Sequence, residues 1–269
     1  MRFKLSLAIV ASFVAAPAVA EDKWLPEHVT PARGIYLGVF GGGGFSTSTN
    51  VSQLGTAFFT EAEGGPLAVN ATGRTNSGGV GFVGGQIGYE WAYGSVVLPA
   101  FEIEGFYLGA GTRRATLQNT GDPLRLPEHT FDSSFPMNNS VFLANLVLSF
   151  PTLYPGVTPY IGGGIGGARV SVNGANSLQT NPMEAGINHF NSGPDSSAWT
   201  FAVQAKAGVR VAIGRNAYVF GEYRYLYVGS SDQIFGPTVD PTHVPTTAWT
   251  VRFDDTSYHL ATAGIGLNF

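Results

Sequence analysis

Two acidic residues, Glu102 and Glu104, are the first candidates for chemistry, because a spacing of two puts both carboxylates on one face of a β-strand. A pair of carboxylates can work as a general acid and a general base. The same face carries no histidine or serine partner, however, and buried charges are normally paired. We therefore predict that these acids belong to an internal ion network formed by Glu90, Glu102, Glu104, Lys206, Arg210, Glu222 and Arg224.

Three glycines, Gly162, Gly164 and Gly167, match the pattern G-x-G-x-x-G, which binds dinucleotides when it joins a strand to a helix. Here the pattern continues into the segment ARVSV, which has no helical periodicity. We expect these glycines to allow close packing within a strand, and the pattern gives no reason to expect a nucleotide cofactor.

Histidine side chains are the remaining candidates, since imidazole binds metal ions and haem. His129, His189 and His243 fall in three different long polar segments, and His259 lies at the loop end of the last strand-like segment. None of them has the spacing of a known metal-binding motif. We therefore expect solvated histidines, no metal site and no cofactor, and keep these four as haem candidates. No Ser, His and Asp arrangement can be anchored either, so we predict that the protein is not an enzyme.

The composition narrows the classes of protein and partner. There is no cysteine, which excludes disulfides and cysteine-based catalysis or metal sites. Only 12% of the residues are charged, against about 25% in soluble domains. The formal net charge is −4 and becomes more negative without the N-terminal Arg2 and Lys4, so nucleic acid is not an expected partner.

The N-terminus has the layout of a secretory signal peptide. Arg2 and Lys4 precede an apolar run, and Ala18-Val19-Ala20 forms a small-x-small cleavage pattern. The run is shorter than the roughly 20 apolar residues of a membrane-spanning helix. We predict a signal peptide over 1–20 that is cleaved after Ala20, a periplasmic segment over 21–33, and a single folded domain over 34–269.

Eight strand-like segments bounded by Gly, Pro, Asn or Asp follow. Short connections at 92–95, 151–157 and 214–216 alternate with long polar ones at 47–79, 110–139, 173–197 and 229–256. This alternation is typical of outer-membrane barrels, which have short periplasmic turns and long external loops. We predict an all-β fold, an eight-stranded antiparallel up-and-down transmembrane β-barrel with four long extracellular loops, whose strands cover 34–46, 80–91, 96–109, 140–150, 158–172, 198–213, 217–228 and 257–269.

Four of these segments, 80–91, 96–109, 198–213 and 217–228, have one face with charged residues and one without, but a soluble lipocalin-like barrel would show the same alternation with the two faces exchanged. Three features favour the membrane. The charged faces also carry small residues, lysine is nearly absent from the strands, and aromatic rings lie near the strand ends as in girdles. The expected girdle residues are Tyr89, Trp91, Phe150, Tyr160 and Phe269 near the short turns, and Tyr107, Phe142, Trp199 and Tyr227 near the long loops.

Several segments resemble the small OmpA-like outer-membrane barrels of Gram-negative bacteria, and most of all the Omp25/opacity-type surface proteins of alphaproteobacteria. These segments are GIYLGVFGGGG, GGQIGYEW, TPYIGGGIGGA, YVFGEYRYLY and AGIGLNF, and the resemblance covers residues 34–269. It implies that the barrel-assembly machinery reads the terminal strand as an assembly signal, here Gly264, Ile265, Leu267 and Phe269.

We therefore expect an integral outer-membrane protein with a structural envelope role and a surface-antigen role. Its expected partners are outer-membrane lipid, lipopolysaccharide and, during biogenesis, the barrel-assembly machinery. The interior of an eight-stranded barrel is just wide enough for side chains to fill, which disfavours a diffusion pore. The alternatives are loops that bind haem or a host ligand, a small porin and, more remotely, a soluble periplasmic lipocalin-like carrier.

Overall fold

The protein is built almost entirely from antiparallel β-strands. The structure, a computed structural model, describes residues 33–92, 96–119, 129–151 and 156–269. Among these residues the one helical element is a 3-10 turn, η1 (Glu61–Glu63). The described residues therefore contain no helix that is long and apolar enough to span a membrane. The expected signal peptide over 1–20 and all but the last residue of the segment 21–33 lie outside the described residues.

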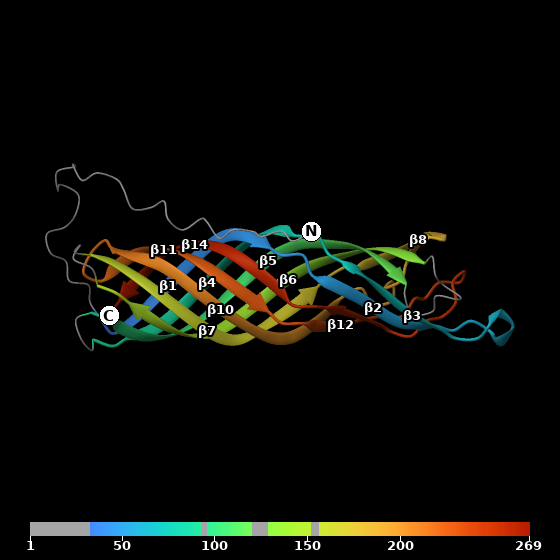
Figure 1. The fold of residues 1–269 in the computed structure, drawn as a ribbon, viewed down its shortest axis with the longest axis horizontal. Coiled ribbons are helices and arrows are strands. Elements are labelled where there is room, and N and C mark those ends of the chain that lie inside the picture. The colour runs from blue at the N-terminus through green and yellow to red at the C-terminus, as the bar shows by residue number, and fades with distance from the viewer. Residues whose placement is uncertain (1–32, 93–95, 120–128, 152–155) are drawn as a thin grey trace, which may run out of the picture.

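Eight long strands close into a barrel (Figure 1). Each strand pairs antiparallel with the next, and the last pairs with the first over a register that runs from Tyr36 opposite Asn268 to Ser46 opposite Tyr258. Closure leaves no unpaired sheet edge, as a membrane requires. The predicted eight-stranded antiparallel barrel is confirmed, with strands β1 (Ile35–Ser46), β4 (Gly78–Glu90), β5 (Leu98–Asn119), β6 (Thr130–Ser149), β7 (Val157–Val172), β10 (Ser196–Ala212), β11 (Ala217–Val228) and β14 (Thr256–Asn268).

The two faces of the barrel wall differ in polarity in the way that a lipid environment requires. Val39 and Ile165, both 62% exposed, are examples of the apolar side chains that cover the outside. Glu102 and Arg224 are fully buried on the inside. A soluble carrier would have the opposite arrangement, because its outer face would be polar. The lipocalin-like alternative therefore does not fit the fold.

The four long connections lie where the sequence predicts them, and they are largely built from strands, which the sequence analysis did not predict. Six shorter strands continue the sheet beyond the barrel at the end opposite the short turns. Together with the outer halves of β5 and β6 they form a body that we call the loop-end extension, on the right in Figure 1. Its strands are β2 (Asn50–Ala57), β3 (Leu67–Arg74), β8 (Asn176–Asn181), β9 (Met183–Asn188), β12 (Ser231–Phe235) and β13 (Trp249–Phe253).

The loop-end extension has a buried aromatic core. The ring of Phe190 stacks on that of Phe235 with centroids 4.6 Å apart, and Phe135 meets Phe253 edge to face at 5.0 Å. Trp249 is buried in the same cluster. Burial of each large ring contributes about 1.5–3 kcal/mol, so the extension is a packed body and not a set of separate loops.

Strands β5 and β6 run about ten residues further than the predicted segments 96–109 and 140–150. A register shift between Gly109 and Thr112 interrupts their pairing, and Gly111 takes a positive φ of 65° that suits glycine. Beyond this bulge the outward residues are polar, as at Arg114, while Leu117 points inward and is fully buried. A strand with a polar outer face looked like a loop in the sequence.

Tyr160 is one expected girdle residue that the structure places on the other face. It is 3% exposed and lies inside the barrel, while its neighbour Ile161 points outward. Most of the residues in the segment 161–167, which follows Tyr160 in β7, are glycines, which have no side chain and show no alternation of polar and apolar faces. The sequence therefore did not indicate whether Tyr160 points into the barrel or out of it. Gly208, the residue paired with Tyr160 on the neighbouring strand β10, provides the room, because a Cβ there would overlap the phenol oxygen of Tyr160.

Candidate functional site

The barrel interior holds a charge network centred on Lys206. Its Nζ lies 2.5 Å from Oε1 of Glu102, 3.4 Å from Oε2 of Glu104 and 3.9 Å from Oε2 of Glu222. All of these side chains are almost completely buried. The four side chains come from strands β5, β10 and β11, and they meet in the lumen.

Two arginines complete the network, Arg224 on the side of Lys206 toward the loop-end extension and Arg210 on the side toward the short turns. Arg224 Nη1 donates to Oε2 of Glu104 over 3.0 Å, and its guanidinium also contacts Glu222. The same group lies 4.2 Å from the ring centre of Phe40, within the range of a cation–π contact. Nearer the short turns, Arg210 Nη1 lies 3.1 Å from Oε2 of Glu90. The seven residues of the predicted network thus lie together in the lumen.

Neutral side chains that sequence reasoning missed are also part of this network. The Tyr36 hydroxyl donates to Glu102 over 2.9 Å, and the Tyr160 hydroxyl donates to Glu222 over 2.7 Å. Asn145 donates to Glu102 over 3.1 Å, and Gln204 donates to Glu104. Gln204 shares a face of β10 with Lys206 and Arg210, and this was the available signal for it, whereas the inward face of β6 around Asn145 carries no charge.

A layer of phenylalanine rings fills the lumen next to Arg224. Phe40, Phe82 and Phe106 are buried, and the three pairs of ring centroids lie 6.0–6.3 Å apart. Each of the four lumen carboxylates contacts at least one base. The lumen chemistry is therefore that of a packed, charge-compensated filling.

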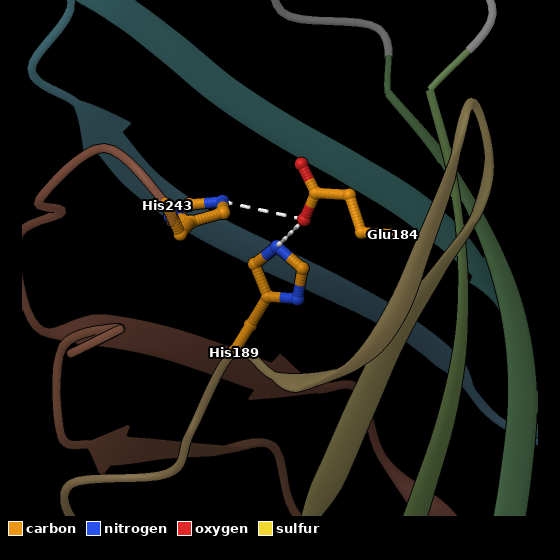
Figure 2. A group of neighbouring side chains, drawn as sticks. All are labelled: Glu184, His189 and His243. Carbon is orange, nitrogen blue, oxygen red and sulfur yellow. Dashed lines mark ion pairs between the residues drawn. The ribbon is translucent and has the colours of Figure 1, made fainter. Parts of the chain in front are cut away.

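A second candidate site lies in the loop-end extension, where Glu184 of β9, His189 and His243 meet (Figure 2). Oε2 of Glu184 is 3.7 Å from Nε2 of His189 and 3.4 Å from Nε2 of His243. The two imidazole rings meet edge to face with centroids 5.1 Å apart. His189 directly follows β9, whereas His243 lies between β12 and β13.

Backbone carbonyl groups orient both imidazoles. The Nδ1 of His189 lies 2.9 Å from the carbonyl oxygen of Ser177, and the Nδ1 of His243 lies 2.6 Å from that of Val244. A carbonyl oxygen can only accept, so in each neutral ring Nδ1 carries the proton and Nε2 carries the lone pair. Both Nε2 atoms therefore present lone pairs toward the Glu184 carboxylate.

The surroundings of His189 keep it neutral. It is 1% exposed and lies against the rings of Phe131 and Trp249, with centroid distances of 5.2 Å and 5.9 Å. Burial lowers the pKa of His189 to about 4, and His243 and His129 also lower it, against the hydrogen bond to Ser177, which raises it. At neutral pH the ring is thus an uncharged donor of an electron pair.

The four histidines considered from the sequence therefore do not share one position. His189 and His243 meet, and His129 lies close enough to His189 to lower its pKa. His259 is elsewhere, on the outer wall, where it stacks on Phe45 at 4.9 Å and contacts the Tyr223 hydroxyl. Sequence reasoning did not find Glu184, because no motif joins it to the histidines.

The terminal strand presents its apolar residues to the outside. Ile265 and Leu267 are exposed, as is Phe269, whose N–H donates to the carbonyl of Ile35 over 2.8 Å. Gly264 faces inward, where a Cβ would overlap the ring of Phe220. The four residues expected to form an assembly signal thus lie on the seam between β14 and β1.

The family to which the sequence is matched agrees with this architecture. A family model described as the outer membrane protein beta-barrel domain matches residues 6–269. No match is found among curated proteins.

Solved structures similar to the chain include Neisserial surface protein A (16% identity, TM-score 0.34, 89% of this chain and 100% of that one). They also include the outer membrane protein OprG from Pseudomonas aeruginosa (12%, 0.42, 90% and 100%) and the outer membrane protease OmpT from Escherichia coli (9%, 0.38, 86% and 97%). Similarity at this level says nothing about activity.

Proposed function

The chain belongs to the outer membrane protein beta-barrel family, and we propose that it is a non-enzymatic structural component of the outer membrane that displays a folded domain at the cell surface. The loop-end extension is that domain, and the filled barrel is its membrane anchor. This proposal includes the surface-antigen role, because an extension that faces outward would be the part of the protein that is accessible from outside the cell.

The filled lumen is the observation that carries the proposal. Lys206, Arg224 and their glutamate partners occupy the interior together with the layer formed by Phe40, Phe82 and Phe106. Ion conduction needs a continuous water-filled channel, and these side chains interrupt such a channel because they contact one another across the barrel. The small-porin alternative is therefore disfavoured.

A conductance measurement tests this role. The protein is purified in detergent, checked for the folded form by its shift in electrophoretic mobility on heating, and inserted into planar lipid bilayers. We expect no conductance steps above the baseline, while an open porin inserted in the same way gives regular steps. Reproducible steps of one size would contradict an anchor with a filled lumen and would restore the porin alternative.

Binding of a host ligand by the loop-end extension is the second candidate function. The observation in its favour is the packed core around Phe190, Phe235 and Trp249, which gives the extension a defined surface. Deletion of the exposed tip at residues 58–66, between β2 and β3, should then lower adhesion to host matrix without loss of folded barrel. Haem is less well supported, since His189 is buried and His259 lies on the outer wall.

We further propose that lipid and lipopolysaccharide contact the apolar outer wall and that the barrel-assembly machinery reads the terminal strand. The exposed ring of Phe269 beside Ile35 supports this idea. Phe269→Ala keeps the backbone hydrogen bond and removes only the ring, so it should lower the amount of folded protein in the outer membrane while export continues. A normal amount of heat-modifiable protein would contradict this role of the ring.

A further inference from the structure

We propose that Glu184, His189 and His243 form a binding site for a divalent transition-metal ion of the zinc class, which links β9 to the connection between β12 and β13. Two imidazole nitrogens and one carboxylate oxygen are a ligand set that zinc accepts, with a fourth position for water. The site is separate from the lumen network and does not depend on the proposed anchoring function.

The spacing of the three ligand atoms is close to that of a metal shell. Bonds of about 2.0–2.1 Å in a tetrahedron place neighbouring ligand atoms about 3.3–3.4 Å apart. Oε2 of Glu184 is 3.4 Å from Nε2 of His243 and 3.7 Å from Nε2 of His189, and all three atoms lie within 4.8 Å of one another. Small side-chain movements would bring them to ligand distances.

The three groups also have the electronic state that a metal needs. Both imidazoles are oriented with Nδ1 toward a carbonyl oxygen, so their Nε2 lone pairs converge with the carboxylate of Glu184. Oε2 of Glu184 is buried, and no described residue donates a hydrogen bond to it. When both imidazoles are neutral, they and the carboxylate direct three electron-pair donors at one position, which is the arrangement that a cation binds.

The residues around the cluster fix the ligand side chains in place and leave access from solvent, as a metal-binding site requires. The carbonyl of Ser177 accepts from both the backbone N–H and Nδ1 of His189, over 3.0 Å and 2.9 Å, which fixes the ring in place. Phe131 and Trp249 form an apolar wall on its other sides. The Glu184 side chain keeps 30% of its surface exposed, which leaves a route for an ion from solvent. Hydrogen-bonded imidazoles in apolar surroundings are typical of metal ligands.

Metal titration of the purified full chain, without a histidine tag, tests the proposal. After treatment with a chelator, the folded protein in detergent is titrated with Zn²⁺ against a chromophoric competitor, and with Co²⁺ to record its visible absorption. We expect one tight site per chain and a Co²⁺ spectrum of tetrahedral intensity. Loss of a direct ligand should weaken binding by on the order of 100-fold, since even supporting partners account for about 10–100-fold.

The variants are chosen to separate this site from incidental binding. His243→Ala and Glu184→Gln should each weaken binding, and His259→Gln, which changes a histidine on the outer wall, should leave it unchanged. Heat-shifted mobility shows in each case that the barrel is folded. The proposal is overturned if wild-type protein has no stoichiometric site, if Glu184→Gln and His243→Ala bind Zn²⁺ like wild type, or if His259→Gln causes the same loss.

Discussion

Lys206 lies against three carboxylates, those of Glu102, Glu104 and Glu222, in a part of the lumen that excludes solvent. Lys206→Met removes the positive charge and keeps most of the side-chain volume. Because the remaining acids then face one another with less compensation, we expect a loss of about 3–5 kcal/mol in the free energy of unfolding. Urea denaturation of the protein in lipid vesicles, followed by tryptophan fluorescence, measures it.

Two further variants show whether this loss comes from unpaired buried charge. Adding Glu102→Gln to Lys206→Met removes one of the uncompensated acids, so the double variant should lose less than the two single variants together. Arg252→Met breaks an exposed pair in which Arg252 Nη1 lies 3.7 Å from Asp232, and it should cost no more than about 1 kcal/mol. Strictly additive effects, or an equal loss at Arg252, would show that Lys206 is not buried among acids.

At the scale of single residues, the sequence predicted the lumen positions of charged side chains better than those of neutral ones. The alternation on β5, β10 and β11 put Glu102, Lys206 and Arg224 on faces that could be recognised by their charges. A tyrosine such as Tyr160 can lie in a polar lumen or in the lipid headgroup region, so the residue type did not indicate which face of the wall it occupies. Its glycine neighbours supplied no alternation, and only the packing against Gly208 and Glu222 settles its place.

Within the wall, glycines opposite large rings determine how closely neighbouring strands approach. Gly266 of β14 lies opposite Tyr218 of β11, and a Cβ at Gly266 would overlap the phenol ring. We therefore expect Gly266→Ala to cost about 1–3 kcal/mol in the free energy of unfolding, as overpacking does. The same denaturation measurement checks it.

Tyr218→Leu should recover part of that loss, because leucine lacks the ring atoms that a Cβ at Gly266 would meet. Gly81→Ala is the matched control on the outer face, where the nearest atom to a Cβ is the carbonyl oxygen of Gly42 at 3.9 Å. This control should stay near wild type. If Gly81→Ala and Gly266→Ala are equally destabilising, backbone freedom and not ring packing explains the glycines.

The centres of the eight barrel strands were predictable, whereas their outer ends and the loop-end extension were not. In lipid a strand alternates between an apolar outside and a mixed inside, a pattern that turn residues clearly interrupt. Beyond Gly111 the outside of β5 meets water and becomes polar, as at Arg114 and Thr116. Short strands of this kind also contain Asn, Ser and Thr, so they resemble loops until their partners are known.

The whole molecule joins two packed bodies with different surroundings, a barrel with an apolar outside and an extension with a polar outside. Their cores are continuous, since one cluster of buried residues runs from Phe40 and Phe106 in the barrel to Phe190 and Trp249 in the extension. The meeting of Glu184, His189 and His243 depends on this packing, which brings residues from two separate connections together. No local pattern could have predicted it.

If the extension faces the outside of the cell, its exposed tip should be the first point of proteolysis. The tip between β2 and β3 is formed by η1, which has no buried residue and carries Glu61 and Glu63 (Figure 1). Most of the extension is held in paired strands, and a protease needs a segment that can leave its hydrogen bonds. A glutamate-specific protease added to intact cells should therefore cut first at this tip and leave the buried Glu102 and Glu222 untouched.

The double variant Glu61→Gln and Glu63→Gln serves as the control, because it removes the scissile residues from the tip and should abolish this first cut on intact cells. The products, separated by electrophoresis without heating, should still migrate as a folded barrel, since the wall strands β1 and β4 stay paired on either side of the cut. Cleavage at Glu61 or Glu63 only after the outer membrane has been opened would mean that the extension faces the periplasm. The surface-display role would then be wrong, although the barrel and its filled lumen would stand.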